Sequence, residues 1–175
     1  MTKQELEMCI DKYGRDIYSF CKHLTNNTPE ADDLYQDTFL TAVKLKEQIE
    51  YANNPKSYFL SIALRIWNNK KRKFAWRKRI ADVQPIADER DAYMSKAAEL
   101  SPEERITNQE KAEAIRTAVN RLPEKLKIVV LLFYMEDLST AQIAETMNIP
   151  TGTVLSRLYQ ARKTLKKDLE DIYYG

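Results

Sequence analysis

The chain has 175 residues, of which 43% are apolar and 31% charged, a composition typical of globular proteins and not of disordered, fibrous or membrane chains. The net charge is +2, and no apolar run approaches the roughly 18 residues that a membrane span needs. Charged residues occupy the stretch where a signal peptide would be apolar, so the sequence predicts a cytoplasmic protein with no membrane insertion of its own.

Apolar residues recur every three or four positions in one segment after another, and this spacing predicts an all-α fold. The first helix is expected from about Gln4 to Leu24. Thr28-Pro29-Glu30 combines a capping residue with a proline at the first helical position, and it predicts a second helix that ends near Gln48. Asn54-Pro55 repeats this signal and starts a third helix with little polar face, which is expected to be the buried centre of the first domain.

The second predicted helix carries acids and large apolar side chains on a side that is expected to be exposed. The core needs only the residues on its opposite side, and an exposed apolar patch rimmed by charge is typical of a protein-docking surface. This candidate docking surface consists of Asp32, Asp33, Gln36, Asp37, Phe39 and Leu40.

The third predicted helix ends in a strongly basic segment. Between Arg65 and Arg79 there are eight basic residues and no acidic ones, with aromatic and amide side chains among them. Aromatic rings among cations suit single-stranded nucleic acid, because bases stack on the rings while the cations follow the backbone. The alternative, which the sequence leaves open, is that Trp67 is core and the lysines are a solvated helix end. The candidate strand contacts are Arg65, Trp67, Asn68, Asn69, Lys70, Arg72, Lys73 and Trp76.

The helical periodicity decays after the basic segment, and residues 80–110 hold eight acidic residues against three basic ones. The sequence therefore predicts two small helical domains, at residues 1–80 and 102–175, joined by an acidic flexible linker at residues 81–101. Helix starts in the second domain are indicated at the capping box Ser101-Pro102-Glu103-Glu104, at Pro123 and at Ser139.

The second domain ends with helix-turn-helix spacing. A helix from about Thr140 to Met147 is followed by a short turn and by a helix from about Gly152 to Ile172, capped by Thr151. The outward face of the last helix is basic and rich in hydrogen-bonding groups, which suits base edges and phosphates of the major groove. A solvated face on an ordinary helical hairpin is the alternative. The candidate duplex contacts on this face are Thr153, Ser156, Arg157, Gln160 and Lys163.

No pattern in the sequence points to catalysis or to a bound metal. His23 is the only histidine, and no phosphate-binding glycine loop is present. Cys9 and Cys21 lack metal-ligand spacing, and on one helix they would lie about 18 Å apart, too far for a disulfide. We therefore expect two buried free cysteines, no metal, no cofactor and no enzymatic activity.

Three segments together resemble the extracytoplasmic-function sigma factors, the smallest class of bacterial sigma subunits. They are residues 30–40 (EADDLYQDTFL), 62–65 (IALR) and 152–158 (GTVLSRL). The resemblance extends over nearly the whole chain, in both domains and in order. It implies a sigma factor that directs core RNA polymerase to specific promoters and initiates transcription at minus-ten and minus-thirty-five elements.

The resemblance also implies a partner for each candidate surface. The docking surface would bind the clamp of core polymerase, and the chain would also contact the flap of the polymerase. The basic segment would hold the melted non-template strand of the minus-ten element. The last helix would bind the minus-thirty-five element as duplex, with Thr151 and Leu155 among its contacts. An anti-sigma factor, through which such a protein can be held at the membrane, is a further implied partner.

Two positions of the last helix depart from the usual pattern of this class. Many members carry a basic residue where this chain has Leu155, and often another at Gln160, so the resemblance assigns no base to either position. The main alternative is a helix-turn-helix transcriptional regulator with a helical sensing or dimerisation domain. It explains the C-terminal half equally well, but it leaves the docking surface and the basic segment unexplained.

Overall fold

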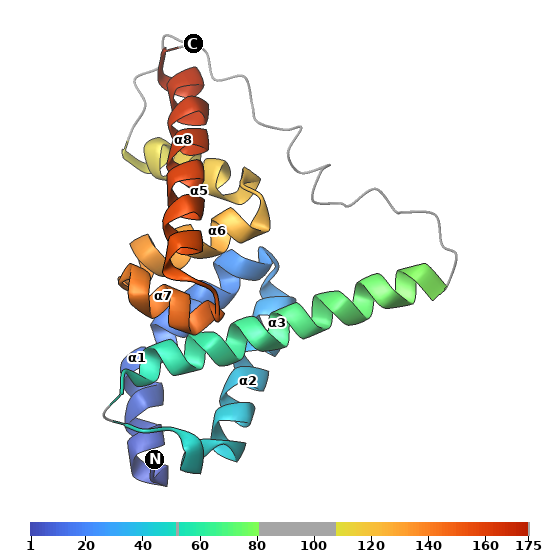
Figure 1. The fold of residues 1–175 in the computed structure, drawn as a ribbon, viewed down its shortest axis with the longest axis vertical. Helices are drawn as coiled ribbons and strands as arrows, with labels where there is room; N and C mark the ends of the chain where they lie inside the picture. Colours follow the sequence, from blue (N-terminus) through green and yellow to red (C-terminus); the bar gives the residue numbers. More distant parts are fainter. Residues whose placement is uncertain (52, 81–107, 175) are drawn as a thin grey trace.

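The computed structural model describes residues 1–51, 53–80 and 108–174, and all regular structure in these ranges is helical, as the apolar spacing predicts (Figure 1). The N-terminal half consists of α1 (Lys3–Thr25), α2 (Thr28–Lys44), the 3-10 turn η1 (Lys46–Gln48) and α3 (Pro55–Ile80). The C-terminal half consists of α5 (Asn108–Arg121), α6 (Glu124–Val130), the π-helical turn η3 (Leu131–Met135), α7 (Thr140–Met147) and α8 (Thr151–Tyr174). The predicted linker and the capping box at Ser101 lie outside the described residues.

The second helix differs from its prediction at both ends. Thr28 is the first helical residue and not the cap, because the Asn27 side chain accepts a hydrogen bond from the Glu30 N–H at 3.0 Å. The helix ends at Lys44, and the chain then continues to Gln48 as the separate turn η1. The start signal was therefore correct to within one residue, whereas the end was placed too late.

α7 and α8 form the predicted helix-turn-helix. Ser139 caps α7 through a capping box, and Asn148 ends it in the left-handed conformation with a φ of 54°. α8 begins at Thr151, because the Pro150 carbonyl accepts the first backbone hydrogen bond of this helix, from the Val154 N–H at 3.2 Å. Pro150 thus occupies the capping position that was predicted for Thr151.

One apolar core runs through both halves. Ile17, Phe20 and Phe59 are fully buried in the N-terminal half, as are Leu132 and Ile143 in the C-terminal half, and all five belong to one continuous cluster. α7 packs on α3, and η3 contacts α1 (Figure 1). Since each fully buried side chain of this size contributes about 1.5–3 kcal/mol, apolar contact holds the two halves together. We call this the closed arrangement.

A buried ion pair also joins the two halves. Lys56 Nζ on α3 lies 2.9 Å from Glu136 Oε2, beyond η3, and 3.3 Å from Asp16 Oδ2 on α1. The Glu136 side chain is 1% exposed, and burial raises the pKa of its carboxyl in spite of Lys56. Burial acts to lower the pKa of Lys56, but its contacts with Glu136 and Asp16 outweigh this effect and raise it. Both groups depend on each other, because either one alone would be a buried unpaired charge.

Candidate nucleic-acid interface

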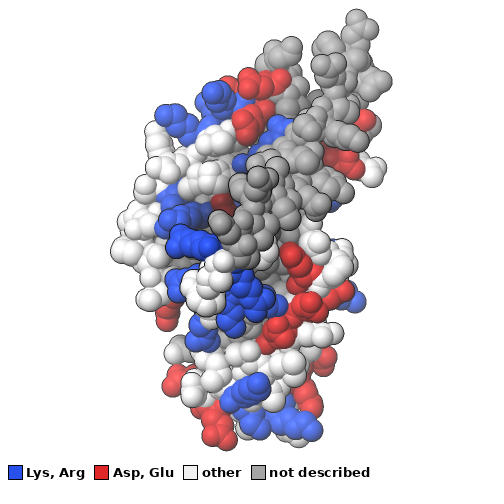
Figure 2. Space-filling model, turned by 90° about the vertical axis from the view of Figure 1, so that its right-hand side faces the viewer, with Lys and Arg blue, Asp and Glu red and all other residues white. Residues whose placement is uncertain are grey.

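The end of α3 after Trp67 is free of buried residues and projects away from the other helices (Figure 1). Residues 68–80 contain seven basic residues and no acidic ones. Figure 2, which faces this end, shows Lys and Arg side chains gathered on the face. Such a cationic helix attracts a phosphate backbone through release of bound counterions. Apart from Trp76, the exposed candidate contacts on α3 are Arg65, Asn68, Asn69, Lys70, Arg72 and Lys73.

Two aromatic side chains lie open among these cations. Trp76 is 64% exposed and Phe74 is 61% exposed, and the Lys78 ammonium lies 4.7 Å from the centre of the Phe74 ring. Exposed rings beside cations can accept stacked bases while the cations contact phosphates. Trp76 is therefore placed as a strand contact requires, and Phe74, which was not among the candidate contacts, is placed equally well.

Trp67 is not placed in this way. It is 5% exposed, and its Nε1 donates a hydrogen bond to Glu124 Oε1, at the start of α6, at 2.8 Å. The Lys71 ammonium forms an ion pair with Glu124 and lies 5.1 Å from the centre of the Trp67 ring. The sequence left open whether Trp67 is a strand contact or a core residue, and in the closed arrangement it is a core residue. The candidate strand contact at Trp67 is thus covered, because a residue of the other half lies against it.

The second candidate surface is the open side of α8. This helix packs through Val154, Leu158 and Ala161, which are buried. Thr153 and Arg157 are half-buried, and an arginine at such a position can still extend its guanidinium to solvent. The exposed candidate duplex contacts are Thr151, Leu155, Ser156, Gln160 and Lys163.

Tyr159, which was not among the candidate contacts, also lies on the open side of α8. It is 67% exposed and follows Leu155, itself 54% exposed, by one helical turn. The spacing of four residues was a signal already present in the sequence. Arg162 is exposed as well, and its Nε donates a hydrogen bond to Tyr134 Oη at 2.7 Å. This bond ties the middle of α8 to η3.

The candidate docking surface lies along α2. Asp32, Asp33 and Gln36 are exposed, and Leu40 is 60% exposed. A groove with a volume of about 360 Å³ runs beside them, and its lining includes Ile10 of α1. An apolar groove rimmed by acids suits a partner that presents apolar and basic side chains.

Two residues of the docking surface are less open than predicted. Phe39 is only 9% exposed, because its ring packs 4.9 Å from Tyr35 and 5.4 Å from Phe59, measured between ring centres. Asp37 is half-buried, and its Oδ2 lies 3.0 Å from Lys70 Nζ. Both differences have one cause: α3 packs against α2 here, and the periodicity of α2 alone does not reveal which neighbour covers it.

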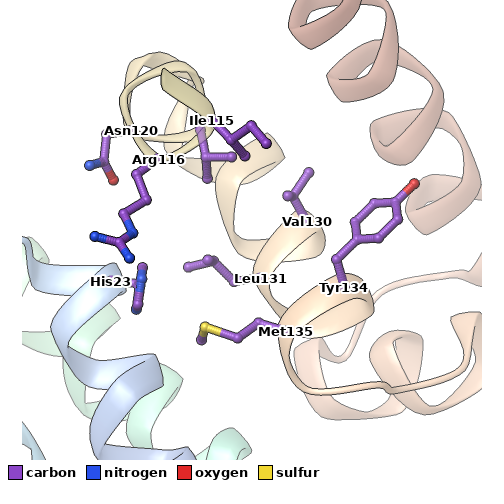
Figure 3. A pocket seen from close by; sticks show the side chains of 9 residues that line it. His23, Ile115, Arg116, Asn120, Val130, Leu131, Tyr134 and Met135 are labelled. Atoms are coloured by element: carbon purple, nitrogen blue, oxygen red, sulfur yellow. The ribbon is translucent and has the colours of Figure 1, made fainter. Parts of the chain in front are cut away.

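A second cavity lies between the two halves. It has a volume of about 210 Å³ and is lined by His23 of α1 together with residues of α5, α6 and η3 (Figure 3). Arg116 extends from α5 toward His23, while Leu131 and Met135 form the apolar side of the cavity (Figure 3). His23 Nδ1 lies 2.8 Å from the Ser19 carbonyl oxygen, which orients the ring. The interface between the halves is therefore incompletely packed at this end.

The cysteines are buried and free, as predicted from their spacing. Burial raises the pKa of both thiols, that of Cys21 to about 12, so neither is a thiolate at neutral pH. Within the described ranges, no group of three or more His, Cys, Asp or Glu side chains could hold a metal ion. The helices that the structure describes include none that is long and apolar enough to cross a membrane.

Two protein-family models match the chain. The model for sigma-70 region 2 matches residues 9–77, and the model for sigma-70 region 4 matches residues 112–165. The first match contains the docking surface and most of the basic end of α3. The second contains α6, α7 and the open side of α8. All three candidate surfaces thus fall wholly or mostly within matched regions.

Curated relatives match along most of their length. SigW, an ECF RNA polymerase sigma factor of Bacillus subtilis (strain 168), is 27% identical over 168 residues, which cover 93% of this chain and 88% of SigW. The RNA polymerase sigma factor SigV of the same organism is 29% identical over 168 residues, which cover 96% of this chain and 93% of SigV.

Solved structures share the fold. The sigma factor RpoE of Bartonella quintana, in complex with the anti-sigma factor NepR, matches with a TM-score of 0.69 and 21% identity over 96% of each chain. CnrH, in complex with the cytosolic domain of CnrY, matches with a TM-score of 0.65 and 16% identity over 97% of this chain and 90% of CnrH.

Proposed function

This chain belongs to the extracytoplasmic-function (ECF) sigma factors and directs RNA polymerase to promoters, and we propose that its two halves divide this task. The N-terminal half docks on core polymerase and captures the melted minus-ten strand, and the C-terminal half binds the minus-thirty-five duplex. One observation carries the proposal: the two nucleic-acid surfaces lie on different halves and differ in chemistry. The chain acts by binding and catalyses no reaction of its own.

The docking surface on α2 binds the clamp of core polymerase. The exposed Asp33 and Gln36 contact basic and polar groups, and Leu40 enters an apolar contact beside the groove. Phe39 supports this contact from below as part of the groove lining. Since these side chains share one helix face, a single charge reversal there should be enough to prevent docking.

The basic end of α3 captures the melted non-template strand. Trp76 offers an open ring for a base, and Asn69 is an exposed amide for hydrogen bonding to a base edge. Exposed lysines and arginines, such as Arg72 and Lys73, follow the phosphates. The strand is held only after melting, because aromatic rings cannot stack on bases that are still inside a duplex.

The open side of α8 binds the minus-thirty-five element as duplex. Ser156 and Gln160 are exposed and can reach base edges, whereas the half-buried Arg157 is suited to a phosphate. Lys163 lies two turns further along and adds a second phosphate contact. Phosphate contacts then set the register, and base contacts select the sequence.

An anti-sigma factor is a further partner that we propose. Support comes from two solved structures of the same fold: the sigma factor RpoE in complex with the anti-sigma factor NepR, and CnrH in complex with the cytosolic domain of CnrY. Transcription in bacteria takes place in the cytoplasm, so we assign the chain to that compartment. An anti-sigma factor anchored in the membrane would hold it at the inner surface.

The test of this function is promoter opening with purified components. Start sites are first mapped by sequencing transcripts that the holoenzyme makes on genomic DNA, and a fluorescent base analogue is then placed at the minus-ten position. We expect a strong signal with the chain and core polymerase together, and little with either alone. Asp33→Arg should remove the signal, whereas Glu113→Arg, the same charge change on the exposed side of α5, should keep it.

The same assay separates the sigma factor from the helix-turn-helix regulator. A regulator would bind or distort promoter DNA without help from the polymerase. Strong opening by the chain in the absence of core would therefore favour an autonomous regulator. Undiminished holoenzyme formation by Asp33→Arg would contradict the docking surface but not the division between the two nucleic-acid surfaces.

A further inference from the structure

An apolar pair stands on the open side of α8. Leu155 and Tyr159 are 54% and 67% exposed, one helical turn apart, on the flank of α8 beside the buried Val154 and Leu158. Neither belongs to the apolar clusters formed by the described residues. The pair adjoins Ser156 and Gln160, so apolar and polar side chains form two parallel stripes on the same surface.

The chemistry of the major groove offers one apolar counterpart. Each base pair presents nitrogen and oxygen donors or acceptors there, and thymine adds its C5 methyl group. Leucine has no hydrogen-bonding group, so Leu155 cannot select guanine, adenine or cytosine by direct bonding. Contact with a thymine methyl removes apolar surface of both partners from water and is therefore favourable.

We propose that Leu155 contacts a thymine methyl group in the minus-thirty-five duplex, and that the ring of Tyr159 shields this contact from water. This assignment rests on the proposed function of α8 and extends it from duplex binding to a base preference. Ser156 and Gln160 remain available for polar edges of the flanking bases. The chain thus selects thymine at a position where a basic side chain would select guanine.

The spacing of the pair fits neighbouring base pairs. Residues four positions apart on an α-helix are separated by about 6 Å along its axis, and base pairs follow one another at about 3.4 Å. When α8 lies in the groove, Leu155 and Tyr159 stand over base pairs that are one or two steps apart. The Tyr159 ring then stands beside the thymine that Leu155 contacts, where it can exclude water from the methyl group.

The experiment removes single methyl groups. Holoenzyme is assembled from the full chain and core polymerase, its preferred minus-thirty-five duplex is selected from a random library, and each thymine in turn is replaced by deoxyuridine. We expect wild-type holoenzyme to lose affinity three- to fivefold at one or two positions, about the effect of one buried methyl group. Leu155→Ala should bind the thymine duplex three- to fivefold more weakly and respond to neither replacement.

Two controls keep the result specific. Lys166→Ala, about three turns further along α8 and exposed, should retain the full response to deoxyuridine. Thermal melting of Leu155→Ala should match that of the wild type, because Leu155 is exposed. A response to deoxyuridine that persists in Leu155→Ala would overturn the assignment, since another side chain would then contact the methyl group.

The remaining outcomes separate this inference from the proposed function. Equal affinity for thymine and deoxyuridine at every position would overturn the contact of Leu155 while leaving duplex binding by α8 intact. Failure to select any duplex would contradict duplex binding itself. Loss of holoenzyme formation by Leu155→Ala would assign the pair to a protein contact and overturn its role in base selection.

Discussion

The two proposed nucleic-acid surfaces differ in what covers them. On α3, Glu124 of the C-terminal half accepts a hydrogen bond from Trp67 and forms an ion pair with Lys71. On α8, Leu155 and Gln160 are exposed in the same closed arrangement. A carboxylate therefore already occupies part of the surface for the single strand, whereas the surface for the duplex is open.

This difference indicates that closure affects the two binding steps unequally. Glu124 neutralises a cation and engages an indole N–H, which are groups that a nucleic-acid strand would otherwise use. We therefore expect the closed arrangement to weaken strand capture more than duplex binding. Contact with core polymerase would favour strand capture by separating the halves.

The largest effect should come from opening the closed arrangement itself. Lys56→Met leaves Glu136 buried without its partner, and removing one member of a buried ion pair costs about 3–5 kcal/mol. We expect the two halves to separate, with a larger radius of gyration in small-angle scattering. Strand capture by the free chain should improve with the same change, whereas duplex binding should stay nearly constant.

Two controls accompany Lys56→Met. The double variant Lys56→Met with Glu136→Leu should recover most of the closed arrangement, because no unpaired charge remains buried. Lys3→Met removes an exposed pair with Glu7, whose charged atoms are 3.9 Å apart, and should change stability by less than about 1 kcal/mol. Equal behaviour of Lys56→Met and Lys3→Met would show that the buried pair does not hold the halves together.

A smaller effect should come from changes on the open side of α8. Gln160→Ala should change the preference at one or two base pairs of the minus-thirty-five duplex, at a cost of about 1–3 kcal/mol. Arg157→Ala should instead weaken binding to all duplexes and flatten its dependence on salt, because it removes a phosphate contact. Both are measured as holoenzyme affinities on a panel of duplexes. If Gln160→Ala lowers binding to every duplex equally, Gln160 does not select bases.

The helices could be predicted from the sequence because their signals are local. A serine at position 139 and an asparagine at position 148 define α7 by satisfying backbone groups within a few residues. The errors at Thr28 and Thr151 are one residue each, since a neighbour, Asn27 or Pro150, holds the capping position instead. Such competition between adjacent candidates is not resolved by residue type alone.

The exposure of single site residues could not be predicted in the same way. Phe39 lies on the docking stripe of α2, but Phe59 of α3 packs against its ring. Trp67 lies in the basic segment, but it is covered by Glu124, 57 residues further along the chain. Helical periodicity tells which residues share a face and not which segment lies against that face. The exposure of both side chains is therefore decided by tertiary contacts.

The smallest effect should come from removing the charge of Glu124, the carboxylate that covers part of the surface on α3. Glu124→Gln keeps an acceptor for Trp67 Nε1 but removes the ion pair with Lys71. One further cation then becomes available to a single strand, so the free chain should bind a minus-ten oligonucleotide about three- to fivefold more tightly, as for loss of a partly exposed ion pair. The plot of log affinity against log salt should steepen by about 0.7, the value for one phosphate contact on a single strand.

Binding to the minus-thirty-five duplex provides the internal comparison for Glu124→Gln, because the open side of α8 does not include this residue. The matched control is Glu113→Gln on α5, which changes the net charge equally at an exposed position. If Glu113→Gln tightens strand binding as much as Glu124→Gln, the gain reflects overall charge and not release of Lys71. If duplex binding improves by the same factor as strand binding, Glu124 does not distinguish the two surfaces, and closure must act on both alike.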